Sequence, residues 1–209
     1  MVKLFGLPGA CPLAPHIVFE EAGIPYEYRP VQKGEPSFEE VKRLNPMAQV
    51  PVLVFDDGRV LTQNSAILHW VAAQVPEKKL LPQEGTFERA RADEWIAFLG
   101  TTVHPAYGRI FNPAGAVSDP ARHDDARRVA IARVEKCLGI AEERLGEGPW
   151  ALGESYSVVD PYLYVFVSWA EPVAKLDLAR FPNLRRHAEA LKARPAAQRA
   201  FAAEGLGKK

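Results

Sequence analysis

Hydrophobic residues in the first part of the chain recur at spacings that alternate between those of strands and those of helices. A short apolar run predicts a buried strand, whereas apolar residues three or four positions apart predict a helix with one buried face. Residues 2–5 form such a run, and residues 13–22 follow helical spacing, with Pro12 suited to the first helical position and Gly23 to a left-handed stop. The same criteria predict a strand at 26–31, a helix at 37–44, strands at 51–55 and 60–61 joined by a turn, and a helix at 65–75.

The hydrophobic pattern changes after residue 80. Residues 81–86 have the composition of a linker, and beyond them the spacing indicates helices and no convincing strand. The helices are predicted near 86–112, 120–145, 157–171, 182–193 and 195–203. The order strand, helix, strand, helix, hairpin, helix before the linker is that of a thioredoxin-like layer. We therefore expect an α/β thioredoxin-like N-terminal domain at 1–80 and an all-α C-terminal helical bundle at 87–209.

Composition and charge narrow the classes of protein. The chain has 209 residues and a mass of 23.1 kDa, enough for a buried core without disulfide bonds or structural metal. Lys and Arg together number 26, as do Asp and Glu, so no net charge would attract nucleic acid or anionic lipid. The mean hydropathy is −0.16, and no apolar run reaches the roughly 18 residues of a membrane span. With no secretory signal visible, a cytoplasmic globular protein without nucleic acid or membrane partners is expected.

Two cysteines carry the first candidate chemistry. Cys11 stands where the first strand leads into the first helix, and helix N-termini favour a thiolate, so we expect a reactive thiol with a lowered pKa. A small buried hydrophobic side chain is the alternative. Because residue 14 is alanine, Cys11 has no local disulfide partner and would react with an external thiol. Cys137 lies on the apolar face of a predicted helix and is expected to be a core residue.

Two further segments offer polar groups to a small peptide. A cis bond at Val50-Pro51 would turn the Val50 backbone outward to pair with an extended peptide, whereas an ordinary edge-strand proline is the alternative. Gln63 and Asn64 open a helix whose free N–H groups form a ready anion site, although simple capping explains these residues equally well. Together with Cys11, the two segments would converge on a small anionic peptide that bears a thiol.

The segments at 9–18, 45–53 and 61–67 together resemble the glutathione S-transferases, most closely the bacterial beta class. The likeness extends over nearly the whole chain. It implies the glutathione S-transferase fold, in which the thioredoxin-like domain binds glutathione as co-substrate. The helical domain would then supply most of the pocket for a small electrophile. The resemblance also implies a homodimer and a role in detoxification.

The resemblance assigns roles within the N-terminal domain. Cys11 matches the family's cysteine that contacts the glutathione sulfur, Val50 the residue that pairs with its cysteinyl backbone, and Pro51 the cis-proline. Gln63 and Asn64 match the pair that holds the γ-glutamyl end. The beta class often has an acidic residue and a small residue at these two positions, so here the γ-glutamyl ammonium has one charged partner fewer.

In the helical half, His104 resembles the family's histidine that reaches the glutathione sulfur, where an imidazole would hydrogen-bond the thiol. Ser157 and Asp160 look like the family's buried N-capping box, which assigns them to folding. Pro161, directly after this box, is a departure that the sequence does not explain. The other histidines show no metal-ligand spacing and no Cys-x-x-Cys motif occurs, so no metal site is expected.

The expected function is that of a glutathione S-transferase, and two chemistries stay open. The glutathione thiolate would attack an electrophile between the domains, or Cys11 would form a mixed disulfide that a second glutathione resolves, as in thiol transfer or peroxide reduction. The alternative of a different class is a non-catalytic binding or stress-associated protein on the same fold. The presence of Cys11 argues against that alternative.

Overall fold

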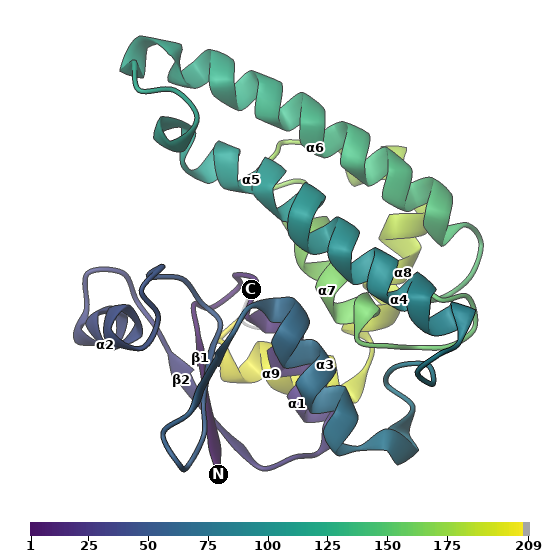
Figure 1. Ribbon diagram of the computed structural model, residues 1–209. Helices are drawn as coiled ribbons and strands as arrows, with labels where there is room; N and C mark the ends of the chain where they lie inside the picture. Colours follow the sequence, from purple (N-terminus) through teal and green to yellow (C-terminus); the bar gives the residue numbers. More distant parts are fainter. Residues whose placement is uncertain (207–209) are drawn as a thin grey trace.

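The computed structural model describes residues 1–206, which form two parts packed side by side (Figure 1). The first part is a four-stranded sheet with helices on both faces, and the second part is built from helices. The elements of the first part, in chain order, are β1 (Val2–Gly6), α1 (Leu13–Ala22), β2 (Tyr26–Pro30), α2 (Pro36–Leu44), β3 (Val52–Val54), β4 (Val60–Thr62), α3 (Asn64–Gln74) and the short 3₁₀ turn η1 (Pro76–Lys78).

The sheet has the strand order β2-β1-β3-β4 and the mixed pairing of a thioredoxin-like layer. β1 pairs parallel with β2 and antiparallel with β3, and β3 pairs antiparallel with β4. Successive strand residues face opposite sides. Leu4 and Leu53 therefore join the core under α1 and α3, while Phe5 packs with Val41 of α2 on the other face. The fold expected from the sequence is confirmed for this part.

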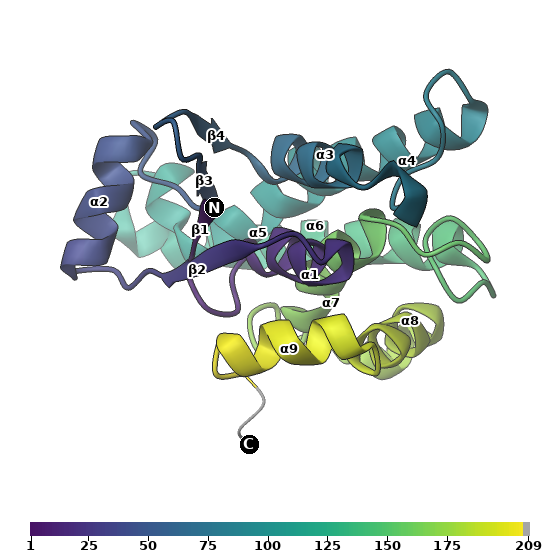
Figure 2. The same ribbon diagram turned by 90° about the horizontal axis from the view of Figure 1, so that it is seen from below.

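The second part follows the linker and consists of helices joined by turns and by longer loops, such as residues 146–158, which contain two isolated β-bridges. Figure 1 shows α5 and α6 reaching away from the sheet, and Figure 2 shows α8 and α9 on the opposite side of α1 from α3. Its elements are α4 (Phe87–Phe98), the π-helical turn η2 (Leu99–Val103), α5 (His104–Phe111), the 3₁₀ turns η3 (Pro113–Gly115) and η4 (Pro120–Arg122), α6 (His123–Leu145), α7 (Val159–Ser168), the 3₁₀ turn η5 (Leu178–Arg180), α8 (Pro182–Lys192) and α9 (Pro195–Ala203).

The single helix expected at 86–112 is interrupted in the structure by η2. Pro105 has no N–H to donate to the carbonyl of Thr101, so the regular helical ladder cannot continue through this point. The N–H of His104 instead bonds the carbonyl of Leu99, five residues back, which is the π-helical pattern. The interruption sets His104 at the start of a new helix.

A buried carboxylate organises the start of α7. Asp160 is fully buried and accepts hydrogen bonds from the N–H of Ser157 at 2.7 Å, the N–H of Ala151 at 2.7 Å and Nε2 of His187 at 3.0 Å. Ser157 Oγ in turn accepts from the N–H of Val159. Pro161 is the third residue of α7, where an N–H would have no partner within the helix, so its presence costs no helical hydrogen bond.

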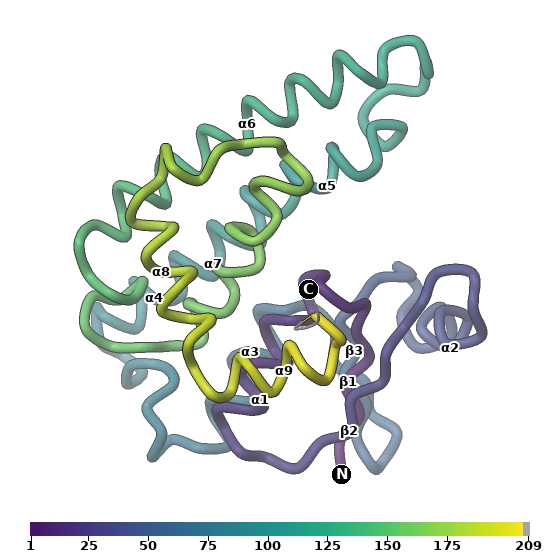
Figure 3. The backbone as a smooth tube through the Cα atoms, turned by 180° about the vertical axis from the view of Figure 1, so that it is seen from behind, coloured from purple at the N-terminus to yellow at the C-terminus, as the bar shows by residue number. Residues whose placement is uncertain are grey.

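α1 is the helix that both parts share. It packs against α3 within the first part and against α7 and α9 of the second, and every residue from Leu13 to Phe19 is buried. Figure 3 shows the chain returning along α9 to lie beside α1. This return is fixed by Arg194, which bonds both carboxylate oxygens of Glu21 at 2.5 and 3.1 Å. Within residues 1–206, no helix has the length and apolar character that crossing a membrane requires.

Candidate functional site

One pocket brings together the six residues that the sequence singled out for a site. Its volume is about 670 Å³, and it lies between loops of the sheet and helices of the second part. The residues come from four separate segments: the turn before α1, the loop before β3, the start of α3 and the start of α5. They are Cys11, Val50, Pro51, Gln63, Asn64 and His104.

Cys11 lies in the pocket wall with its thiol buried. The residue is 7% exposed, and its S–H donates a hydrogen bond to the carbonyl of Val50 at 3.5 Å. Burial raises the pKa of the Cys11 thiol to about 12, although the Asn64 side chain lowers it in part. The expectation of a lowered pKa is therefore wrong, because desolvation outweighs the helix N-terminus. At neutral pH this group is a thiol.

The first turn of α1 explains why the helix N-terminus does not offset burial. Pro12 and Pro15 have no N–H. The two N–H groups between them are both occupied, since Leu13 donates to the carbonyl of Ala10 at 3.0 Å and Ala14 donates to the carbonyl of Cys11 at 3.2 Å. The donors that the sequence interpretation assigned to the sulfur are thus either missing or already bonded to backbone.

The turn that carries Cys11 is held from the second part of the molecule. Gly9 has φ +71° and donates its N–H to Oε2 of Glu204 at 2.8 Å, while its carbonyl accepts from Nε1 of Trp169 at 2.9 Å. Oε1 of Glu204 lies 2.7 Å from Nδ1 of His16, and both of these side chains are fully buried. Residues at the end of α9 and α7 therefore position the Cys11 turn.

The loop before β3 presents the Val50 backbone to the pocket. The Val50-Pro51 peptide bond is cis, as the sequence suggested. Asn45 fixes the loop, because its Nδ2 donates to the carbonyl of Gln49 at 2.8 Å and its Oδ1 accepts from the N–H of Met47 at 3.1 Å. The N–H of Val50 forms no hydrogen bond with any group in residues 1–206.

Gln63 and Asn64 occupy the start of α3 but face different surroundings. Gln63 is exposed and has φ +73°, a conformation uncommon outside glycine. Asn64 is 5% exposed, and its Nδ2 donates to the carbonyl of Cys11 at 3.1 Å. Its Oδ1 is buried and has no hydrogen-bond partner among the described residues. The Asn64 side chain therefore lies at the Cys11 end of the pocket, whereas the sequence interpretation grouped it with Gln63 at the γ-glutamyl end.

His104 stands at the first position of α5 and faces an aromatic cluster. Its ring centroid lies 5.4 Å from that of Phe166 and 5.9 Å from that of Trp169. Burial lowers the pKa of the His104 imidazole, so the ring is neutral at neutral pH. A neutral ring can exchange hydrogen bonds with a sulfur but brings no positive charge to it.

Several residues that line the pocket were missed in the sequence. Lys33 lines it and forms no ion pair within residues 1–206, and Phe111 is 55% exposed there. Tyr162 of α7 also lines the pocket. No local pattern marks these positions, because Lys33 stands in an ordinary turn and the other two follow helical spacing like core residues.

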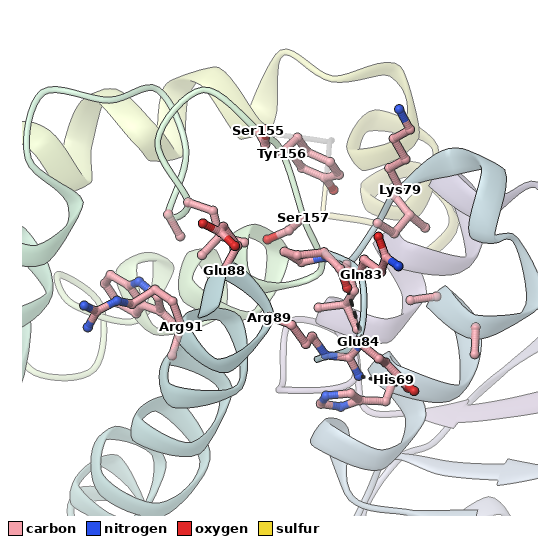
Figure 4. Close-up of a pocket in the computed structure, with 18 of the residues that line it drawn as sticks. His69, Lys79, Gln83, Glu84, Glu88, Arg89, Arg91, Ser155, Tyr156 and Ser157 are labelled. Atoms are coloured by element: carbon pink, nitrogen blue, oxygen red, sulfur yellow. Dashed lines mark hydrogen bonds and ion pairs between the residues drawn. The ribbon is translucent and has the colours of Figure 1, made fainter. Parts of the chain in front are cut away.

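A larger hollow of about 1460 Å³ lies elsewhere, between α3, the linker and the start of α4 (Figure 4). None of the six expected site residues lines it. Several of its basic side chains are paired with carboxylates, since Asp93 contacts both His69 and Arg89, and Glu94 pairs with Arg91.

The remaining candidates for chemistry are structural within the described chain. Cys137 is 1% exposed in the core of α6, and burial raises its pKa. No group of three or more His, Cys, Asp or Glu side chains in residues 1–206 is placed to hold a metal ion.

Comparison with known proteins supports the resemblance noted in the sequence. The family models described as "Glutathione S-transferase, N-terminal domain" and "C-terminal domain" match residues 10–74 and 93–190. The chain is 32% identical to glutathione S-transferase GstA of Escherichia coli O157:H7, over 98% of this chain and 100% of that protein.

Solved structures agree with the sequence comparison. A sphingomonad glutathione S-transferase complexed with glutathione is 36% identical, with a TM-score of 0.85 and coverage of 98% and 100% of the two chains. The bacterial beta-class glutathione S-transferase of Sphingomonas chungbukensis is 34% identical, with a TM-score of 0.86 and coverage of 98% and 99%. The resemblance to the bacterial beta class is confirmed.

Proposed function

The chain belongs to the glutathione S-transferase family, and on this premise we propose that it binds glutathione in the pocket lined by Cys11 and transfers the glutathione sulfur to small hydrophobic electrophiles. One observation carries the proposal: three separate segments bring the free backbone N–H of Val50, the unpartnered amide oxygen of Asn64 and the unpaired Lys33 side chain to the same pocket. The N–H and the ammonium are complementary to the carbonyl and carboxylate oxygens of a short peptide, and the amide oxygen is complementary to one of its hydrogen-bond donors.

Glutathione would lie extended along the loop before β3. The free N–H of Val50 would donate a hydrogen bond to its cysteinyl carbonyl, as in pairing with an added strand. The γ-glutamyl carboxylate would meet Gln63 and the N-terminus of α3, where backbone N–H groups favour an anion. Lys33 is suited to the glycyl carboxylate at the other end. The sulfur would then lie near Cys11 and His104.

The helical part would complete the pocket for the electrophile. Phe111, which lines the pocket and packs against Trp169 with ring centroids 5.3 Å apart, would provide an apolar surface for the electrophile. We propose that the domain at residues 1–80 binds glutathione and that the domain at residues 87–209 supplies the pocket for the second substrate. Residues 81–86 link the two domains. The electrophile is expected to be small and hydrophobic.

The high pKa of Cys11 favours conjugation over thiol exchange as the main activity. A thiol with a pKa of about 12 is a poor nucleophile at neutral pH and acts as a neutral neighbour of the glutathione sulfur. Thiol transfer stays a second function because Cys11 lies in the pocket wall. Its thiolate would attack the glutathione sulfur of a mixed disulfide and release the substrate thiolate. A second glutathione thiolate would then attack the cysteine–glutathione disulfide, which frees Cys11 and forms glutathione disulfide.

A calorimetric titration with glutathione tests the proposal. We expect saturable binding of one glutathione per chain, and turnover of a chloronitrobenzene with release of chloride. Binding without turnover of either the chloronitrobenzene or a small mixed disulfide would favour the alternative of a non-catalytic binding protein. Absence of binding would remove glutathione as co-substrate and overturn the proposal.

We further propose that the protein is a homodimer and works in the cytoplasm, as the family resemblance implies. Phe87, which is 71% exposed at the edge of the larger hollow, provides an apolar group of the kind that subunit interfaces cover. Light scattering at micromolar concentration should give twice the mass of one chain. The mass of a single chain would contradict the dimer.

A further inference from the structure

One face of α5 forms part of the wall of the glutathione pocket. Its residues are His104, Pro105, Gly108 and Phe111, all of which line the pocket. Residues three or four positions apart lie on the same side of a helix, so this spacing places the four in one row. The row has a gap at Gly108, because glycine contributes no side chain between Pro105 and Phe111.

Neither the backbone nor the packing of α5 requires a glycine at position 108. Gly108 is not among the residues with positive φ, and its carbonyl accepts the N–H of Asn112 at 2.9 Å, as in a regular helix. A Cβ atom built on Gly108 would meet no atom within 4 Å beyond its own helix backbone and chain neighbours. Since glycine is unfavourable inside a helix, the gap gives up helix stability and leaves open space at the pocket.

Gly100, which also lines the pocket, shows the contrast. A Cβ atom built there would lie 3.3 Å from the hydroxyl oxygen of Tyr162, so the absence of a side chain serves the packing of η2 against α7. At Gly108 an added side chain would instead occupy the free space beside the pocket wall. The size of residue 108 therefore bears on the room for a ligand.

The ring of Phe111 forms one side of the gap and is held in place. Phe111 is 55% exposed, and its ring meets that of Trp169 at 5.3 Å with an angle of 88° between the planes. Nε1 of Trp169 donates to the carbonyl of Gly9 at 2.9 Å, in the turn that carries Cys11. This chain of contacts ties the Phe111 ring to the turn beside which the glutathione sulfur would lie.

The ring of Pro105 forms the other side of the gap. Pro105 precedes Phe111 by six residues, which corresponds to about 9 Å along the axis of a helix. A flat ring between two groups needs about 3.5 to 4 Å on each of its faces, so the gap suits one aromatic layer. Aromatic rings also pack favourably on one another, which makes the Phe111 side of the gap a surface for such a ring.

We propose that Gly108 determines the size of the electrophile that the protein accepts, and that the gap between Pro105 and Phe111 takes a fused aromatic ring system attached to the reacting carbon. The proposal rests on the proposed function, because it requires glutathione in this pocket. The glutathione thiol loses its proton to solvent, and the sulfur electron pair forms the bond to the reacting carbon. In an arylmethyl chloride the carbon–chlorine bond breaks at the same time and chloride leaves.

The test compares benzyl chloride with a chloromethylnaphthalene, which have the same reacting group but differ by one fused ring. The value of kcat/KM is measured for each at saturating glutathione, after subtraction of the rate without protein. The readout is the ratio of the naphthyl value to the benzyl value. Because both compounds react with the same glutathione sulfur, the ratio cancels any change in the thiolate itself.

We expect the unchanged protein to convert the naphthyl compound at least as efficiently as the benzyl compound. Gly108→Leu fills the gap and should lower the ratio by about tenfold or more, since a steric difference of one methylene in an apolar pocket already discriminates by about tenfold. Gly108→Ala should lower the ratio by less. Phe111→Ala removes one side of the gap and should also lower it.

Gly139→Leu is the matched control. Gly139 lies inside α6 and also has no atom near an added Cβ, but it lines neither of the two hollows described above. This variant should leave the ratio unchanged. Leucine is more favourable than glycine inside a helix, so the urea midpoint of unfolding should not fall in either leucine variant. An altered ratio in Gly108→Leu with an undiminished midpoint therefore reports on the pocket.

The outcomes distinguish this proposal from the one it rests on. If the unchanged protein does not bind glutathione in a calorimetric titration, the proposed function fails. If it binds glutathione and converts benzyl chloride but rejects the naphthyl compound, the gap takes no second ring and the role of Gly108 is overturned. An unchanged ratio in Gly108→Leu, or an equal fall in Gly139→Leu, would also overturn that role and leave the proposed function standing.

Discussion

Cys11 lies beneath the carbonyl of Val50 at the start of α1, and two physical effects act on its thiol in opposite directions. A helix N-terminus favours the thiolate, whereas removal from water favours the thiol. Desolvation is the larger effect here, and the pKa rises to about 12. The prolines at 12 and 15 are the reason that the sequence position misleads, since they remove the N–H groups that would have lowered the pKa.

The first prediction concerns the reactivity of the Cys11 thiol. With a pKa of about 12, on the order of one molecule in 100,000 carries the thiolate at pH about 7. Cys11 should therefore alkylate more slowly than free glutathione at neutral pH, with a rate that rises about tenfold for each pH unit up to the pKa. Mass spectrometry of iodoacetamide adducts measures this rate, and Cys137→Ser isolates Cys11. A neutral-pH rate above that of free glutathione would contradict the raised pKa.

The second prediction concerns the variant Cys11→Ala. A neutral thiol contributes one weak hydrogen bond near the sulfur, so conjugation of a chloronitrobenzene should fall by less than about tenfold. Exchange with a small mixed disulfide should disappear, because no other cysteine lines the pocket within the described residues. The two activities are measured on the same preparation. Intact disulfide exchange would mean that another group carries that chemistry.

Among the elements, α7 depends on a buried carboxylate at its first turn. Asp160 satisfies donors from the preceding loop and from α8, so one side chain fixes both the start of α7 and its contact with α8. The N-capping box can be predicted from the sequence, because Ser157 is followed three residues later by Asp160 and both partners lie close together along the chain. The contribution of His187 was not visible, because it comes from a distant helix.

Asp160→Ala should destabilise the protein without changing its chemistry. The variant leaves the N–H groups of Ala151 and Ser157 and the ring of His187 buried without a partner, which costs about 3 to 5 kcal/mol of unfolding free energy. Urea unfolding measures this loss. The affinity for glutathione, measured by calorimetry below the unfolding transition, should stay within about twofold. A loss of affinity in folded protein would give Asp160 a role beyond folding.

The elements show where sequence pattern suffices and where it does not. Strand and helix positions up to residue 75 were predicted to within one or two residues, because turn residues such as Gly23 mark their ends. The helix at 86–112 was predicted as one piece, and η2 was missed. Helical spacing persists through a π-helical turn, so the pattern gives little sign of it, although Pro105 marks the break once its missing N–H is considered.

At the scale of the whole molecule, the site residues that could be predicted are those of the N-terminal part, where local turns fix their direction. Cys11 and Val50 each follow from a short segment. Tyr162 and Glu204 could not be found in this way, because they reach the pocket and the Cys11 turn only when α7 and α9 pack against α1. Their spacing is that of ordinary helix residues, and the tertiary contact alone brings them to the pocket or to the Cys11 turn.

Glu204 connects the end of the described chain to its beginning. Its carboxylate accepts the N–H of Gly9 and meets Nδ1 of His16, and all three groups lie beside the turn that carries Cys11. Trp169 bonds the other side of the same glycine. The position of the sulfur site is thus set by contacts across the full length of the chain, and weakening them should affect stability and binding together.

The variant Glu204→Ala tests this connection. It leaves His16 and the N–H of Gly9 buried without an acceptor, so the unfolding free energy should fall by about 3 to 5 kcal/mol. The affinity for glutathione should fall as well, because the turn that carries Cys11 loses one of the two hydrogen bonds that fix Gly9. Glu204→Gln keeps an oxygen that accepts from the N–H of Gly9, so it should lose less unfolding free energy and less affinity for glutathione than Glu204→Ala.

Glu189→Ala is the matched control, because it removes only an exposed ion pair with Lys192. It should change the unfolding free energy by less than about 1 kcal/mol. Reduced stability with unchanged glutathione affinity in Glu204→Ala would show that this carboxylate holds the two parts of the molecule together without positioning the site.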